Sequence, residues 1–80
     1  MVVAFVGIKT GKGEQLNLLK IIEEELKRIP GVLEAYRVFG RYDLIAKIEV
    51  ESLEKLSSLI VDKIRAISGV ESTETFIVMT

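Results

Sequence analysis

The sequence predicts one α+β domain in which strand, helix, strand, strand, helix and strand follow one another along the chain. Three observations lead to this prediction. Turn and helix-stop signals divide the 80 residues into six segments, the apolar residues of two segments recur at helical spacing, and the two halves of the chain resemble each other. This order predicts a four-stranded antiparallel sheet that carries two helices on one face.

Four segments have the composition of strands. Residues 2–9 form a nearly continuous run of β-branched and aromatic residues, which is typical of an interior strand. Residues 32–39 and 43–50 are rich in Val, Ile, Tyr and Phe and are separated by a short turn, so they predict a hairpin. Residues 70–79 supply the last strand.

Two segments have the pattern of amphipathic helices, residues 14–29 and residues 53–67. Ser52 stands directly before the second segment, where it is expected to cap the first turn. The apolar stripes are Leu18, Ile22, Leu26 and Ile29 in the first helix, and Leu53, Leu56, Ile60, Ile64 and Ile67 in the second.

An internal repeat supports this order. A shift of 38 residues places six residues of the first half on identical residues of the second, at equivalent points of two β-α-β units. Two such units with right-handed crossovers interleave into the ferredoxin-like plait. The matching pairs are Lys9 and Lys47, Leu18 and Leu56, Ile22 and Ile60, Ile29 and Ile67, Gly31 and Gly69, and Val32 and Val70.

The predicted sheet has more apolar surface than two helices can cover. One face carries Leu44, Ala46, Ile48 and Val50 and is expected to lie beneath the helices. The other face carries Val3, Phe5 and Ile45, with one of two alternating sets from the second and fourth strands: Val38, Phe76 and Val78, or Leu33, Phe39, Ile77 and Met79. We therefore expect a homodimer in which two sheets pack face to face, as in a dimeric α+β barrel.

The composition excludes several classes of function. Eleven basic and 12 acidic residues give a net charge of −1, so we expect no direct DNA binding. The absence of Cys and His removes thiolate and imidazole catalysis and nearly all transition-metal sites, so no cofactor, metal or enzymatic activity is expected. The Gly11–Gly13 loop lacks the Walker pattern, so we expect no phosphate site there. The side chains of Glu23–Glu25 point in different directions around a helix, so we expect no metal site there.

The composition also suggests where the protein works. The apolar runs are too short for a membrane span, and no signal peptide precedes the first strand, so a cytoplasmic protein is expected. One Asn, one Gln and abundant Ile, Glu and Lys suggest a thermophilic source.

One turn carries chemistry that a plain hairpin does not need. Gly40 and Asp43 are ordinary turn residues, but Arg41 and Tyr42 stand between them. We expect Asp43 to accept hydrogen bonds from an ammonium group and Tyr42 to form a pocket wall. Backbone N–H groups near Gly40 and Arg41 would hold a carboxylate. Together these groups would bind a small zwitterion, and we expect the polar stretch Ser72–Thr75 to lie on the other side of it.

At these residues the sequence resembles the effector-binding domain, or RAM domain, of the Lrp/AsnC family of transcription regulators. The G-x-Y-D turn followed at family spacing by G-V-x-S-T-x-T is specific in combination, and the resemblance covers essentially the whole chain. The matching stretches are Ile29–Tyr36, Val38–Leu44 and Ile67–Thr75, which continues into Ile77–Val78.

The resemblance implies dimers formed by pairing of sheets, further assembly of dimers, often to octamers, and a free amino acid bound between dimers. Because Val2 already begins the first strand, residues 1–80 are expected to form one RAM-like domain with no helix-turn-helix domain, similar to the stand-alone RAM modules. A full-length Lrp/AsnC regulator is then an expected partner. The residues implied to bind the ligand are Gly40, Arg41, Tyr42 and Asp43, with Thr73 and Thr75 as neighbours.

Two alternatives to an amino-acid-binding regulatory module stay open from the sequence. One is a structural or interaction oligomer in which the turn holds no ligand. The other is a small enzyme of the dimeric α+β barrel type, which the absence of His disfavours.

Overall fold

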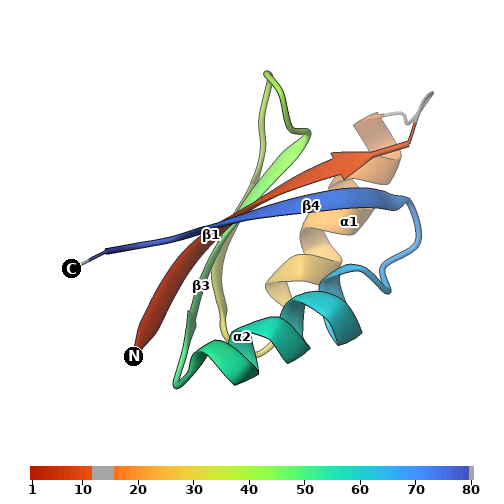
Figure 1. Cartoon of the computed structure of the whole chain (residues 1–80). Helices are drawn as coiled ribbons and strands as arrows, with labels where there is room; N and C mark the ends of the chain where they lie inside the picture. The colour runs from red at the N-terminus through yellow and green to blue at the C-terminus, as the bar shows by residue number, and fades with distance from the viewer. Residues whose placement is uncertain (12–15, 80) are drawn as a thin grey trace.

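The computed structural model describes residues 1–11 and 16–79, and its elements follow the predicted order (Figure 1). The predicted start of the first helix at residue 14 and residues 12 and 13 of the glycine loop lie outside the described residues. The elements are β1 (Val2–Thr10), α1 (Leu16–Lys27), β2 (Val32–Arg37), β3 (Leu44–Val50), α2 (Leu53–Ser58), η1 (Leu59–Ile64) and β4 (Val70–Ile77).

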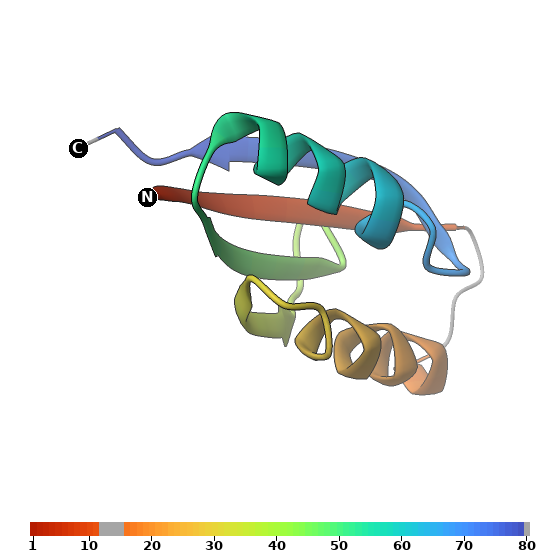
Figure 2. The same cartoon turned by 90° about the horizontal axis from the view of Figure 1, so that it is seen from below.

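The four strands form one antiparallel sheet in the order β2-β3-β1-β4, which is the order of a ferredoxin-like plait. The prediction of the fold is therefore confirmed. The strand β1 pairs with β3 on one side and β4 on the other, as expected for an interior strand. Figure 2 shows α1 on the side of β2, and α2 with η1 on the side of β4.

The second helix begins as predicted and then widens. The Oγ atom of Ser52 accepts a hydrogen bond from the backbone N of Lys55 at 3.2 Å, which confirms the expected N-cap. After Ser58 the helix continues as the π-helical segment η1, where the N–H of Arg65 bonds to the carbonyl of Ile60, five residues earlier, at 2.9 Å. The regular helix predicted over residues 53–67 is thus only partly correct.

The hairpin strands are shorter than predicted because their connecting loop takes residues from both. The strand expected over residues 32–39 ends at Arg37, and the strand expected from residue 43 begins at Leu44. The last strand ends at Ile77, although the N–H of Val78 still bonds to the carbonyl of Val3 at 2.8 Å.

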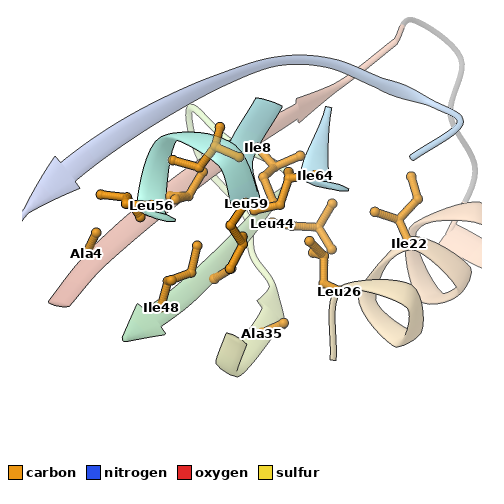
Figure 3. Close-up of a cluster of buried hydrophobic side chains, with 13 residues drawn as sticks. Ala4, Ile8, Ile22, Leu26, Ala35, Leu44, Ile48, Leu56, Leu59 and Ile64 are labelled. Atoms are coloured by element: carbon orange, nitrogen blue, oxygen red, sulfur yellow. The ribbon is translucent and has the colours of Figure 1, made fainter. Parts of the chain in front are cut away.

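The core lies between the sheet and the two helices and is almost entirely aliphatic (Figure 3). The predicted helix-side face is confirmed, since Leu44, Ala46 and Ile48 are fully buried, and Val50 packs at the edge of the core. The buried hydrophobic residues are Ala4, Val6, Ile8, Ile22, Leu26, Ala35, Leu44, Ala46, Ile48, Leu56, Leu59, Ile60 and Ile64.

The sheet register decides which alternating set lies on the opposite, open face. Phe5 pairs with Phe76, so Phe76 lies on the open face, and so does Val78, which is two residues further along the chain. Tyr36 pairs with Ile45, so Tyr36 lies on the open face as well. Phe5, Phe76 and Tyr36 are 39%, 48% and 54% exposed in the single chain. No helix of the described chain covers this apolar surface, as the sequence predicts.

Candidate functional site

The loop between β2 and β3, residues 38–43, contains the four consecutive residues predicted to bind a ligand. A hydrogen bond of 3.0 Å from the N–H of Val38 to the carbonyl of Asp43 closes the loop. Gly40 has a φ angle of +145°, which favours glycine, and a Cβ atom there would meet no described atom within 4 Å. The loop therefore needs glycine at this position and leaves open space beside it.

Asp43 fastens this loop to the end of β1. Its N–H donates to the carbonyl of Ile8 at 2.9 Å, and its Oδ2 atom accepts hydrogen bonds from the N–H and the hydroxyl of Thr10, both at 2.8 Å. These bonds from Thr10, with a smaller contribution from the charge of Lys9, lower the pKa of Asp43 below its ordinary value. Within the described structure Oδ1 carries no hydrogen bond, so an ionised oxygen is left for a ligand.

Tyr42 lies on the open face of the sheet, directly over Gly7. A Cβ atom at Gly7 would lie 2.7 Å from the Cγ and Cδ2 atoms of the Tyr42 ring, closer than real side chains approach. The ring also meets Phe76 edge to face, with centroids 6.4 Å apart and planes at 73°. Tyr42 thus connects the loop with the apolar surface expected to form the dimer.

Arg41 places a positive charge on the solvent-exposed side of the loop. Its side chain is exposed, and its carbonyl accepts a hydrogen bond of 3.4 Å from Nζ of Lys9. The loop backbone is therefore held to β1 by Lys9 as well as by Thr10, while the guanidinium group of Arg41 stays available to a partner or ligand.

A groove of about 300 Å³ runs beside the loop and reaches α1. It is lined by Leu19, Arg37, Val38, Phe39 and Asp43, so it has an apolar wall with a cation and an anion. The Nε atom of Arg37 is 3.1 Å from a carboxylate oxygen of Glu23, which fixes the cation near the groove. This combination suits a small zwitterion with an aliphatic side chain.

Thr73 and Thr75, the other predicted site residues, lie on the helix-side face of β4. They pair with Ile8 and Val6, whose side chains are buried beneath the helices, whereas Tyr42 lies on the opposite face. The hydroxyl of Thr73 accepts a hydrogen bond of 3.2 Å from Nε of Arg65. One chain therefore does not bring the two threonines together with Tyr42.

Thr75 lines a second groove, of about 420 Å³, between β4 and the helical pair α2 and η1. Its lining is mostly aliphatic and includes two hydroxyl groups and one guanidinium group. The lining residues are Leu53, Leu56, Ser57, Ile60, Val61, Arg65, Thr75 and Ile77. We call this groove the β4 groove.

Three residues that shape the loop were not predicted as part of the site. Gly7 could have been found, because glycine inside a run of β-branched strand residues signals a close approach by another group. Thr10 and Arg37 carry no such signal, since their roles depend on contacts with Asp43 and on the groove beside the loop.

The chain matches the family model of the Lrp/AsnC ligand binding domain over residues 3–80. It is 38% identical over 56 residues to an uncharacterized HTH-type transcriptional regulator of Pyrococcus horikoshii, covering 70% of this chain and 37% of that protein. It is 32% identical over 78 residues to the HTH-type transcriptional regulator FL11 of Pyrococcus furiosus, covering 98% of this chain and 48% of the relative. The chain thus spans half or less of the length of these curated relatives.

Two solved structures show the same fold. One is a protein from Thermus thermophilus with a TM-score of 0.88 and 32% identity, covering 100% of this chain and 95% of the other. The second is a feast or famine regulatory protein from M. tuberculosis complexed with L-methionine, with a TM-score of 0.82 and 25% identity, covering 100% and 51%. The Pyrococcus and Thermus relatives agree with the thermophilic character of the composition.

Two features are absent from the described residues. No helix among them has the length and apolar character needed to cross a membrane. Residues 1–11 and 16–79 also contain no group of three side chains placed to hold a metal ion.

Proposed function

Because the chain belongs to the family of Lrp/AsnC ligand binding domains, we propose that it is a regulatory module that binds a free amino acid. It acts on transcription through protein assembly and makes no direct contact with DNA. It forms homodimers through the open face, and the dimers assemble further, up to octamers. Its regulatory partner is a full-length regulator of the same family.

The open face supports the homodimer. Phe5, Phe76 and Tyr42 form an apolar surface on β1, β4 and the loop, and packing of two such sheets would remove it from water. Lys47 lies 6.0 Å from the centre of the Phe5 ring and 3.9 Å from a carboxylate oxygen of Glu34, so its charge has partners on this face.

The chemistry of the loop supports the amino-acid ligand. The observation that carries the proposal is the ionised, structurally fixed carboxylate of Asp43 in a groove that also contains the Arg37 cation and the apolar side chain of Leu19. The Oδ1 atom of Asp43 would accept a hydrogen bond from the ligand's ammonium group. Backbone N–H groups near Gly40 and Arg41, or the Arg37 guanidinium group, would bind its carboxylate. The M. tuberculosis relative is complexed with L-methionine, an amino acid of suitable size.

The regulatory effect follows from linkage. A ligand that binds only the assembled form stabilises that form by RT ln(1 + [L]/Kd). A ligand enclosed between dimers would therefore shift the protein toward the larger assembly and change its availability to a regulator partner.

Thermal unfolding in the presence of each of the 20 common amino acids at millimolar concentration tests this function. At a hundred times Kd, binding contributes about 2.7 kcal/mol, which raises Tm by roughly 10–20 °C for a domain of this size. Asp43→Asn should remove the shift, whereas the matched control Asp62→Asn, at an exposed position of η1, should keep it. If no amino acid raises Tm, or if Asp43→Asn responds like the parent protein, the proposed function is wrong.

A purely structural oligomer is the second candidate, favoured by one observation. Asp43 already accepts two hydrogen bonds from Thr10, so a role in fixing the loop accounts for part of its chemistry. The same experiment separates the two functions, because a structural oligomer shows no response to any amino acid.

A further inference from the structure

We propose that Gly7 of β1 and Phe76 of β4, which lie outside the loop, are positioning residues of the amino-acid site. They fix the ring of Tyr42 on the open face of the sheet, and through this ring they set where Asp43 presents its Oδ1 atom. The inference rests on the proposed function and deepens it, since it names the residues of the sheet that control the affinity for the ligand. The positioning acts within one chain, however the copies assemble.

Tyr42 and Asp43 are consecutive residues of the loop whose side chains take different directions. Asp43 accepts hydrogen bonds from Thr10 at the end of β1 and lines the groove that reaches α1. The ring of Tyr42 instead lies over Gly7, on the open face of the sheet. One peptide group therefore joins the residue that would bind the ammonium group to a residue that is packed against the sheet.

Gly7 makes room for the Tyr42 ring and fixes how closely the ring approaches the sheet. A Cβ atom at Gly7 would lie 2.7 Å from the Cγ and Cδ2 atoms of the ring, so the ring lies directly on the backbone of β1. That backbone is held on both sides, because Gly7 pairs with Ile45 of β3 and with Glu74 of β4. The surface beneath the ring is therefore rigid.

Phe76 holds the same ring from the side. The two rings meet edge to face, with centroids 6.4 Å apart and planes at 73°, an arrangement in which aromatic rings attract each other. Phe76 pairs with Phe5 of β1, so its own position is set by the sheet and not by the loop. Gly7 and Phe76 together thus fix both the height and the direction of the Tyr42 ring.

The position of the ring matters because it restrains the backbone that carries Asp43. In Gly7→Ala the ring would have to withdraw by about 0.7 Å, the difference between 2.7 Å and the 3.4 Å at which ordinary contacts begin. Binding groups generally have to be held within roughly 0.5 Å of their productive geometry. A shift that passes from Tyr42 to Asp43 should therefore weaken the hydrogen bond from the ammonium group to Oδ1.

Isothermal titration calorimetry tests both residues, with the amino acid that raises the Tm of the parent protein most as the probe. Gly7→Ala and Phe76→Leu should each raise Kd by about ten- to a hundredfold, the usual effect of losing a hydrogen bond to a charged group. Phe76→Tyr keeps an aromatic ring beside Tyr42 and should bind like the parent protein.

Two matched controls separate positioning from stability and from the open face. Gly31→Ala also brings a Cβ too close to a side chain, 2.9 Å from Cδ1 of Leu59 and away from Tyr42. It should lower stability but leave Kd within about twofold of the parent value. Phe5→Leu removes a ring from the open face, as Phe76→Leu does, but the ring that meets Tyr42 is that of Phe76. Phe5→Leu should therefore also leave Kd unchanged.

Near-UV circular dichroism reports the Tyr42 ring itself. The chain contains two Tyr and no Trp, so in a Tyr36→Phe background Tyr42 is the only tyrosine. The tyrosine band depends on fixed packing around the ring. In this background Gly7→Ala and Phe76→Leu should reduce the band, whereas the two control variants should keep it.

Failure of the proposed function is distinguishable from failure of this inference. If no amino acid raises the Tm of the parent protein, the proposed function is wrong and the inference falls with it. If the parent protein binds an amino acid, and Gly7→Ala and Phe76→Leu bind it with the same Kd, the ring does not control the site and the proposed function stands.

The other outcomes also decide against the inference. An unchanged tyrosine band in Gly7→Ala and Phe76→Leu would show that these residues do not fix the ring. If Gly31→Ala or Phe5→Leu weakens binding as much, the affinity follows stability or the open face as a whole. Should Gly7→Ala fail to fold, the comparison of Phe76→Leu with Phe76→Tyr decides, because equal Kd values for these two would overturn the inference.

Discussion

The close packing of Tyr42 on Gly7 makes the effect of one methyl group predictable. In Gly7→Ala the new Cβ would lie 2.7 Å from the ring, against the 3.4–4 Å of ordinary contacts. The backbone cannot move away, because Gly7 is in the interior strand β1 and pairs with Ile45 on one side and Glu74 on the other. The ring must therefore move, and overpacking of this kind lowers the free energy of unfolding by about 1–3 kcal/mol.

The sign of this effect should reverse when the ring is removed. In a Tyr42→Ala background the methyl group of Gly7→Ala meets no ring, and replacement of a strand glycine by alanine then raises stability by about 0.5–1 kcal/mol. The double-mutant cycle should give a coupling energy of about 1.5–4 kcal/mol. Urea unfolding followed by circular dichroism, at one fixed protein concentration, measures all four proteins.

Gly31→Ala provides the control for this cycle. A Cβ there would lie 2.9 Å from Cδ1 of Leu59, far from Tyr42 in the fold, and φ is +102°. The free energy of unfolding that Gly31→Ala removes should be the same with and without the Tyr42 ring. Equal costs of Gly7→Ala in the two backgrounds would refute the argument that the Tyr42 ring is what requires glycine at this position.

Three further changes have outcomes set by single contacts. Ser52→Ala removes the cap of α2 and should lower the free energy of unfolding by about 1 kcal/mol in urea. Thr10→Val removes a hydroxyl bond to Asp43 and should cost about 1–2 kcal/mol at neutral pH. Because that bond helps to lower the pKa of Asp43, the loss of stability in Thr10→Val should be present above the ordinary pKa of Asp and should vanish as the pH falls through the lowered pKa. Unfolding measured at neutral and at strongly acidic pH checks this. Phe5→Glu should split the dimer into monomers in sedimentation, and an unchanged profile would show that the open face is not the interface.

The elements and the helix-side face of β3 could be predicted because they depend on local periodicity. The strand alternation of Leu44, Ala46 and Ile48 places three apolar residues on one side, and the structure buries all of them. The π-helical segment could not be predicted, because Leu56, Ile60 and Ile64 recur every four residues and fit a regular α-helix equally well.

The parts of the candidate site were predictable, but their arrangement was not. The G-x-Y-D turn was found from its residue types, yet the bond from Thr10 to Asp43 joins residues 33 positions apart and depends on the register of β1 with β3. The side of the sheet on which Thr73 and Thr75 lie likewise depends on the pairing of β4 with β1, which the sequence left open between two alternating sets.

Neither groove alone encloses a small ligand, and this openness links ligand affinity to assembly. A pocket that binds a small molecule well usually buries 70–90% of the ligand surface. The groove beside the loop and the β4 groove are both open to solvent in one chain, because residues such as Phe39, Val61 and Ile77 on their walls are half or fully exposed. Under the proposed function, a second copy that covers such a groove would supply the missing wall, so affinity for the amino acid would rise only with assembly. By reciprocity, the amino acid would then stabilise the assembly by the same free energy, and a metabolite concentration would be converted into a change of oligomeric state.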